Sequence, residues 1–150
     1  MATTTGQRRP PLRLDDQLCF SVHAASRAII GRYRPLLDEL GLTYPQYLVM
    51  LVLWEQGPTT VGALGGRLHL DSGTLSPLLK RLEQAGLVER TRRPEDERSV
   101  LIATTDAGER MQERSHAVFE CVVAASGMPA EEVRALQATL ERLTAAMRED

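Results

Sequence analysis

Two cysteines, Cys19 and Cys121, are the most reactive side chains in this 150-residue sequence. Cys19 lies near the start of a predicted helix, where the positive end of the helix dipole favours a thiolate, the form that attacks a peroxide. Asp15 and Asp16, just before it, oppose this effect because like charge disfavours the anion. Tyrosine hydroxyls are the donors that could compensate. The alternative is that a cysteine beside apolar residues simply fills a core.

Composition describes an ordinary globular chain of one domain. Hydrophobic residues make up 43% and charged residues 25% of the sequence. Two cysteines and three scattered histidines argue against a disulfide scaffold and a zinc site, so we expect no metal and no cofactor. The longest uncharged stretch, residues 40–54, is too short and too polar to span a bilayer, and no N-terminal stretch resembles a signal peptide. We therefore expect a cytoplasmic protein without a membrane partner.

Basic charge gathers in one part of the chain, although the formal net charge is −2. Residues 80–93 hold five basic groups against Glu83 and Glu89, whereas residues 104–150 are net acidic. Such a patch is typical of a nucleic-acid-binding surface. Chance clustering on a solvated face is the alternative.

The spacing of apolar residues predicts a mainly α domain with one small β-ribbon. Residues 1–13 are polar and contain paired prolines, so we expect a flexible arm before a single domain at 14–150. Helices are expected at about 14–40, 43–56, 60–68, 72–85, 105–126 and 131–147. Two strands are expected at 87–92 and 98–104, around a polar tip at 93–97.

These elements follow one another in the order of a winged helix-turn-helix, with its lobe at about 43–104. In the helix at 72–85 four leucines occupy one side, and the opposite side is small, polar and basic. That face suits a major groove, because hydroxyls read base edges and Lys or Arg binds phosphates; an ordinary solvated face is the alternative. Pro77 is expected to bend this helix or disturb its first turn. The expected DNA contacts from this helix are Ser72, Thr74, Ser76, Lys80 and Arg81.

The ribbon that follows is rich in arginine. Arginine near a hairpin tip can enter the narrow minor groove, where the negative potential is deepest. Asp96 lies two positions before Arg98, and pairing between them would hold the guanidinium extended; a surface ion pair of little consequence is the alternative. The expected DNA-binding residues of the ribbon are Arg90, Arg93, Asp96 and Arg98.

Several motifs resemble the MarR family of bacterial repressors. The run Asp96-Glu97-Arg98-Ser99-Val100, followed by Thr105-Asp106-Ala107-Gly108, is similar to the wing signature of that family. Three further runs resemble its organic hydroperoxide resistance subgroup: Leu42-Thr43-Tyr44-Pro45-Gln46-Tyr47, Leu70-Asp71-Ser72-Gly73-Thr74-Leu75 and Leu78-Leu79-Lys80-Arg81-Leu82-Glu83. The resemblance covers about residues 14–147. It implies a dimeric winged-helix repressor whose helices at about 14–40 and 105–150 interlock between protomers.

The same resemblance assigns roles to the cysteines and to two tyrosines. In the peroxide-sensing subgroup two tyrosines bind the reactive sulfur, at 14 and 25 positions after it; in this chain those offsets from Cys19 give Tyr33 and Tyr44. A second cysteine in the long C-terminal helix resembles the two-cysteine branch of the subgroup. The resemblance therefore implies that Cys19 is the peroxidatic cysteine and that Cys121 of the opposite protomer resolves it.

The resulting hypothesis is a redox-sensing transcriptional repressor and not an enzyme. Reduced, the homodimer binds double-stranded operator DNA; an organic hydroperoxide oxidises Cys19, an intersubunit disulfide forms, and the DNA is released. The inducer is expected to enter an apolar pocket lined by Phe20, Met50, Leu51 and Trp54. One alternative is a repressor of the same family that senses a small phenolic or aromatic ligand. The other, a cysteine-dependent peroxidase, conflicts with the scarcity of strands.

Overall fold

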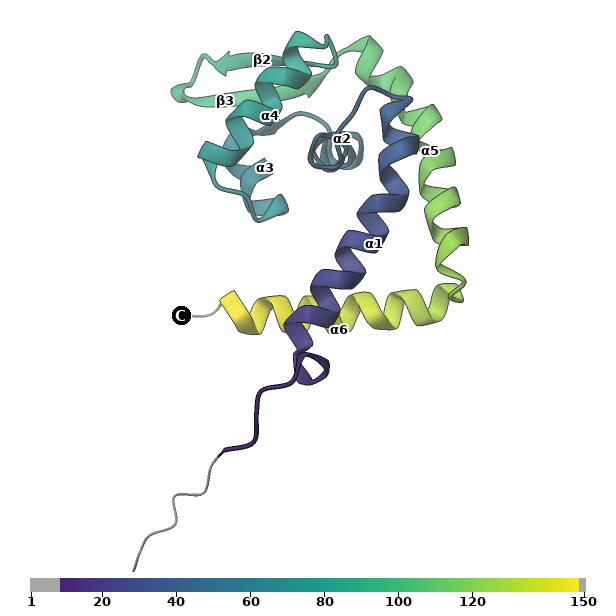
Figure 1. Cartoon of the computed structure of the whole chain (residues 1–150). Coiled ribbons are helices and arrows are strands. Elements are labelled where there is room, and N and C mark those ends of the chain that lie inside the picture. Colours follow the sequence, from purple (N-terminus) through teal and green to yellow (C-terminus); the bar gives the residue numbers. More distant parts are fainter. Residues whose placement is uncertain (1–8, 149–150) are drawn as a thin grey trace, which may run out of the picture.

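The computed structural model describes residues 9–148, apart from the side chains of Glu97 and Arg98. Within these residues the fold is mainly helical with one small antiparallel sheet, as expected (Figure 1). The elements are η1 (Leu14–Asp16), α1 (Leu18–Asp38), α2 (Tyr44–Gln56), β1 (Thr59–Thr60), α3 (Val61–Leu68), α4 (Ser72–Gln84), β2 (Val88–Arg93), β3 (Asp96–Thr104), α5 (Asp106–Ser126) and α6 (Ala130–Arg148). Residues 1–8 of the expected flexible arm lie outside the described residues.

The first helix begins later than the sequence predicts and is not interrupted at Pro35. A short 3₁₀ turn, η1, precedes α1, and α1 then continues through Pro35 to Asp38. A proline within a helix removes one main-chain hydrogen bond, but the rest of the helix can absorb that loss where neighbours pack against it. Here α1 lies beside α5, as Figure 1 shows, and Leu37 near its end is buried.

Capping side chains define where the helices of the central lobe begin. Thr43 and Gln46 form a reciprocal capping box at the start of α2, with the Gln46 main-chain N–H donating to Thr43 Oγ1 at 3.4 Å. Thr60 caps α3, and Asp71 caps α4. These bonds satisfy main-chain N–H groups that have no partner within their own helix. Local sequence therefore explains the start of each of the three helices.

The sheet differs from the expected two-stranded ribbon in two respects. Its order is β1-β3-β2, and the added strand is the two-residue β1, in which Thr59 pairs with Ile102. The hairpin is also longer than expected: β2 extends to Arg93 and β3 starts at Asp96, with a register shift between Arg92 and Arg93. The polar tip predicted at 93–97 is therefore wrong in extent, because cross-strand pairing continues to the Arg93–Asp96 pair.

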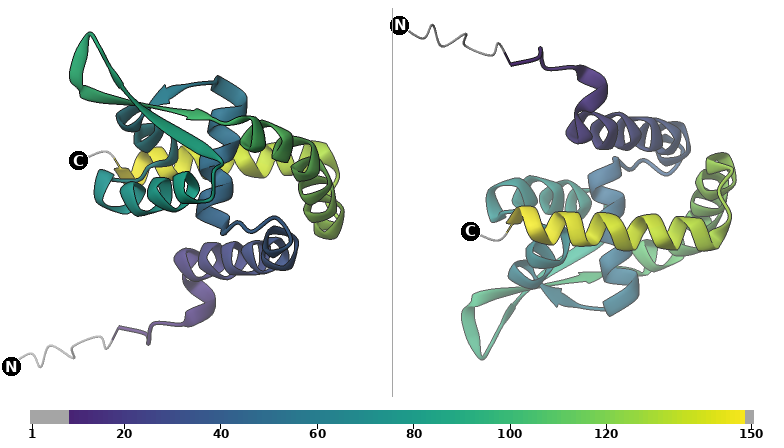
Figure 2. Two further views of the ribbon diagram at one scale, coloured as in Figure 1. Left: turned by 90° about the horizontal axis from the view of Figure 1, so that it is seen from above. Right: turned by 90° about the horizontal axis from the view of Figure 1, so that it is seen from below.

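The hydrophobic core lies inside the lobe, where α2 is surrounded by α3, α4, the sheet and the start of α5 (Figure 2). The fully buried side chains include Val49, Met50, Leu64, Leu75 and Ile102. Leu75, Leu79 and Leu82 of α4 are all buried, as the leucine face in the sequence predicts. The opposite face of α4 is consequently turned outward.

Apolar side chains remain exposed on the helices outside this core. None of the residues of α6 is buried, and α1 buries only Leu37 among the side chains described. Figures 1 and 2 show α6 running beneath the lobe at the end of α5. Helices with uncovered apolar faces ordinarily pack against something else. The exposed apolar residues are Leu14, Leu18, Phe20, Val22, Ile29, Phe119, Leu136, Leu140 and Met147.

None of the helices in the described part of the chain combines the length and apolar character needed to cross a bilayer.

Candidate DNA-reading surface and redox site

The outward face of α4 carries the polar and basic residues that the sequence singled out. Ser72, Thr74, Ser76, Lys80 and Arg81 are all exposed on this helix. The Thr74 main-chain N–H donates to Asp71 Oδ1 at 2.7 Å, which lowers the pKa of the Asp71 carboxyl and holds the first turn. The helix continues through Pro77 to Gln84. This gives a continuous, solvent-facing surface with hydroxyls in its first turns and two cations further along.

The hairpin of β2 and β3, which we call the wing, is joined to α4 by an ion pair that the sequence does not reveal. Arg90 Nε lies 3.1 Å from Glu83 Oε2, so this arginine of β2 is held against α4. Both side chains are more than one-third exposed, so the pair adds little stability. Arg93 is exposed at the end of β2 and pairs with Asp96 in the strand register. The side chain of Arg98, expected at the wing tip, lies outside the described residues.

The three tyrosines of the chain form one cluster. The ring centroids of Tyr33 and Tyr44 are 5.2 Å apart, and Tyr47 lies 5.6 Å from Tyr33. Burial raises the pKa of both Tyr33 and Tyr44, with the neighbouring Tyr44 adding to the effect on Tyr33. Both phenols therefore stay protonated at neutral pH and can donate a hydrogen bond. The structure thus brings together the two tyrosines that the offsets from Cys19 select.

The geometry of α1 keeps Cys19 away from this tyrosine cluster within its own chain. Cys19 is the second residue of α1 and Tyr33 follows 14 positions later on the same helix. An α-helix rises about 1.5 Å per residue, so the two are about 21 Å apart along the axis. Cys19 and Cys121 are both free and exposed. Cys19 and Tyr33 of one chain are therefore too far apart for a hydrogen bond between them.

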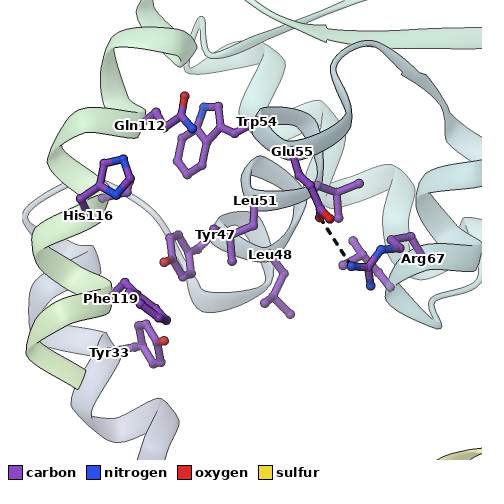
Figure 3. Close-up of a pocket in the computed structure, with 13 residues that line it drawn as sticks. Tyr33, Tyr47, Leu48, Leu51, Trp54, Glu55, Arg67, Gln112, His116 and Phe119 are labelled. Atoms are coloured by element: carbon purple, nitrogen blue, oxygen red, sulfur yellow. Dashed lines mark hydrogen bonds and ion pairs between the residues drawn. The ribbon is translucent and has the colours of Figure 1, made fainter. Parts of the chain in front are cut away.

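A cavity of about 520 Å³ opens between α2 and α5 beside the tyrosines (Figure 3). Leu51 and Trp54, which the sequence placed in a pocket, are in its lining. Met50 and Phe20 are not: Met50 is fully buried in the core, and Phe20 is exposed on α1. The Glu55–Arg67 ion pair, 3.5 Å long, closes one side of the cavity. The remaining residues of its lining are Tyr33, Tyr47, Leu48, Val52, Leu68, Gln112, Ser115, His116 and Phe119.

Sequence reasoning missed most of the residues that line this cavity. Phe119 and His116 lie on α5, and no local pattern relates them to α2. Tyr47 is a lining residue that helical spacing could have identified, since it lies one turn beyond Tyr44 on the same face of α2. Among the described residues, no group of His, Cys, Asp and Glu is arranged to hold a metal ion.

Comparison with known proteins gives one family match and several close relatives. The model of the MarR family matches residues 42–100. The "Organic hydroperoxide resistance transcriptional regulator" of Bacillus subtilis (strain 168) is 46% identical over 132 residues, covering 88% of this chain and 90% of that protein. The "HTH-type transcriptional regulator TtmR" of Methylorubrum extorquens (strain PA1) is 50% identical over 129 residues, covering 86% of this chain and 66% of that protein.

The solved structures of AbfR of Staphylococcus epidermidis resemble this fold. Its reduced form bound to DNA has a TM-score of 0.76 at 43% identity, covering 91% of this chain and 96% of that chain. Its overoxidised form bound to DNA also has a TM-score of 0.76, whereas its disulfide form has 0.64. The shared winged-helix fold and this sequence identity along nearly the whole chain lead to one conclusion: the chain belongs to the MarR family and is a DNA-binding transcriptional regulator, not an enzyme.

Proposed function

We propose that this regulator is a redox-sensing repressor that binds operator DNA as a reduced homodimer and releases it when organic hydroperoxides oxidise Cys19. The observation that carries the proposal is the pairing of Tyr33 with Tyr44, at a ring-centroid distance of 5.2 Å, at the chain offsets that the peroxide-sensing subgroup uses. The similarity to the Bacillus subtilis regulator, named for organic hydroperoxide resistance, supports the same inducer class.

A homodimer would supply the tyrosine hydroxyls that Cys19 cannot reach within its own chain. Cys19 is about 21 Å along α1 from its own Tyr33, so the phenols that serve its sulfur are the partner subunit's Tyr33 and Tyr44. The exposed apolar faces of α1 and α6 offer the surface on which two copies would interlock. We propose accordingly that residues 14–40 and 105–150 form the dimerisation region and residues 43–104 the DNA-binding lobe.

Each lobe would place α4 in a major groove and its wing over an adjacent minor groove. The exposed hydroxyls of Ser72, Thr74 and Ser76 would face base edges, and Lys80 and Arg81 would bind phosphates. The wing would add Arg93, which is exposed at the end of β2, and Arg98, with Asp96 supporting the latter. Arg90, the remaining expected contact of the wing, would approach DNA from its ion pair with Glu83, which orients it beside α4.

The sensing step is a two-electron oxidation of sulfur. The Cys19 thiolate attacks the terminal oxygen of the hydroperoxide; the S–O bond forms as the O–O bond breaks, and the departing alkoxide takes up a proton to become an alcohol. The partner subunit's Cys121 then attacks the sulfenic acid as thiolate, and the S–S bond forms as water leaves. The apolar cavity beside Tyr33 would hold the organic group of the peroxide.

The disulfide, rather than the oxidised sulfur alone, is expected to release the DNA. For AbfR, an overoxidised form is bound to DNA and matches the present fold as well as the reduced form does, whereas the disulfide form matches less well. A covalent link between α1 of one protomer and α5 of the other would shift two rigid helices that connect to the lobes. Recognition helices so displaced would no longer match successive major grooves.

The test is a non-reducing gel and a gel-shift assay on the same samples, with and without cumene hydroperoxide. The parent protein should form a dimer band that dithiothreitol reverses, and lose operator binding in parallel. Cys19→Ser should bind operator with unchanged affinity and ignore the peroxide. If Cys19→Ser is still released by peroxide, the sensor assignment is wrong.

A second candidate function is supported by the cavity itself. Its volume of about 520 Å³ and its aromatic lining suit a phenolic or aromatic ligand. A repressor of that kind would leave operator DNA on adding such a ligand under fully reducing conditions, with no covalent dimer on the gel. The same pair of assays therefore separates the two functions.

A further inference from the structure

Tyr47 is the most enclosed of the three tyrosines, and the proposed reaction does not yet use it. Its side chain is 2% exposed, one turn of α2 beyond Tyr44. Its ring centroid lies 5.6 Å from that of Tyr33 and 6.5 Å from those of Tyr44 and Trp54. Tyr47 therefore packs against both phenols that would serve the sulfur and against the aromatic wall of the cavity.

Tyr33 and Tyr44 are less enclosed than Tyr47. Tyr33 lies on α1, where only Leu37 is buried among the residues of that helix, and Tyr44 is the first residue of α2. Both are half-buried, whereas Tyr47 belongs to the hydrophobic core. The ring planes of Tyr47 and Tyr33 are inclined at 41°, and those of Tyr47 and Tyr44 at 45°. Tilted contacts of this kind are favourable between aromatic rings and fix their relative orientation.

The hydroxyl group of Tyr47 faces other residues than its ring does. Figure 3 shows it directed toward α5, where Phe119 and His116 line the cavity. Burial, together with Tyr33 and Tyr44, raises the pKa of Tyr47 to about 12. Tyr47 thus brings no charge to the cluster at neutral pH, and what it offers to Tyr33 and Tyr44 is the packing surface of its ring.

We propose that Tyr47 is a positioning residue of the peroxide sensor: its buried ring sets the distance and orientation of Tyr33 and Tyr44, so that both hydroxyls meet the sulfur of the partner subunit's Cys19. This inference rests on the proposed function. It adds that three aromatic rings form the sensing site and that Tyr47 fixes them to the hydrophobic core. Small displacements of groups around a reacting atom cost much of the rate, so loss of the ring would slow the oxidation of Cys19.

The experiment measures sulfenic acid formation at Cys19 by dimedone labelling and mass spectrometry, in full-length protein carrying Cys121→Ser so that the disulfide cannot form. Tyr47→Phe keeps the ring and should react with cumene hydroperoxide within about twofold of the parent, whereas Tyr47→Met removes the ring at similar volume and should react about tenfold more slowly. In the reduced state, the affinity for operator DNA and the far-ultraviolet circular dichroism spectrum should be unchanged in both variants. If Tyr47→Met does not fold, Tyr47→Leu replaces it.

A second background separates positioning from general loosening of the core. In protein that also carries Tyr33→Phe and Tyr44→Phe, the hydroxyls that Tyr47 positions are gone, so Tyr47→Met should cause no further slowing. Further slowing there, an unchanged rate in Tyr47→Met alone, or an equal loss in Tyr47→Phe would each overturn the inference. If instead the parent itself fails to form a sulfenic acid at Cys19, the proposed function has failed.

Discussion

The indole Nε1–H of Trp54 donates a 3.0 Å hydrogen bond to the main-chain carbonyl of Gly108, joining the wall of the cavity to the first turn of α5. Gly108 in turn lies against the start of the wing, since a Cβ at this position would overlap the carbonyl oxygen of Leu87. The Thr105 main-chain N–H donates to that same oxygen at 3.1 Å. A continuous set of contacts therefore runs from the cavity to the junction of α4 and β2.

Trp54→Phe should weaken the connection between this cavity and the wing. Phenylalanine keeps an aromatic ring in the lining but removes the N–H donor, so we expect a loss of about 1 kcal/mol in the free energy of unfolding. The oxidised variant should form its disulfide normally yet release operator DNA less completely than the parent. Urea denaturation, a non-reducing gel and a gel shift measure the three quantities. Full release at the parental peroxide dose would show that this hydrogen bond does not transmit the signal.

Gly108→Ala should destabilise the fold by about 1–3 kcal/mol, the range of an overpacked core. The added Cβ would meet main-chain atoms of Leu87 and come within 3.3 Å of Met50 Cε, and a carbonyl cannot move aside as a flexible side chain can. Gly66→Ala is a matched control, because nothing lies within 4 Å of its Cβ position on α3. That variant should be neutral or more stable, since alanine favours a helix. Equal unfolding midpoints in urea for the two variants would contradict the packing argument.

Cys121→Ser should separate sulfur oxidation from DNA release. Without the resolving thiol, Cys19 should still react and then advance to sulfinic acid, because no disulfide intercepts the sulfenic acid. We expect this variant to stay on operator DNA after peroxide treatment, with unchanged affinity in the reduced state. Intact-protein mass spectrometry follows the added oxygens, and a gel shift follows the DNA. Release at the parental dose would mean that oxidation of Cys19 alone is enough.

Lys80→Ala should weaken binding to operator and to unrelated DNA by similar factors, since a phosphate contact carries no sequence information. The slope of log affinity against log salt concentration should fall in magnitude by about 1. Arg134→Ala on α6 is the control, an exposed cation outside the DNA-binding lobe, and its slope should match the parent. Fluorescence anisotropy over a salt series measures both. A variant that lost affinity for the operator alone would indicate that Lys80 reads a base.

Local sequence determined the parts of this protein that depend on nearby residues. Helix starts at Thr43, Asp71 and Thr105 follow from side chains that cap the next turn, and the leucines of α4 define its buried face within the helix itself. The exposed polar and basic face of α4 is their direct consequence. The resemblance to the peroxide-sensing subgroup, and not local sequence, selected Tyr33 and Tyr44, which the structure places in contact.

Tertiary structure decided everything that joins distant segments. The pairing of β1 with β3, the Glu83–Arg90 ion pair and the bond from Trp54 to Gly108 depend on how helices and strands pack, which no short-range pattern encodes. The same is true of the cavity, since its lining comes from α1, α2, α3 and α5. Helix geometry adds the last point: α1 holds Cys19 about 21 Å along its axis from Tyr33, so the chemistry proposed between them would need two chains.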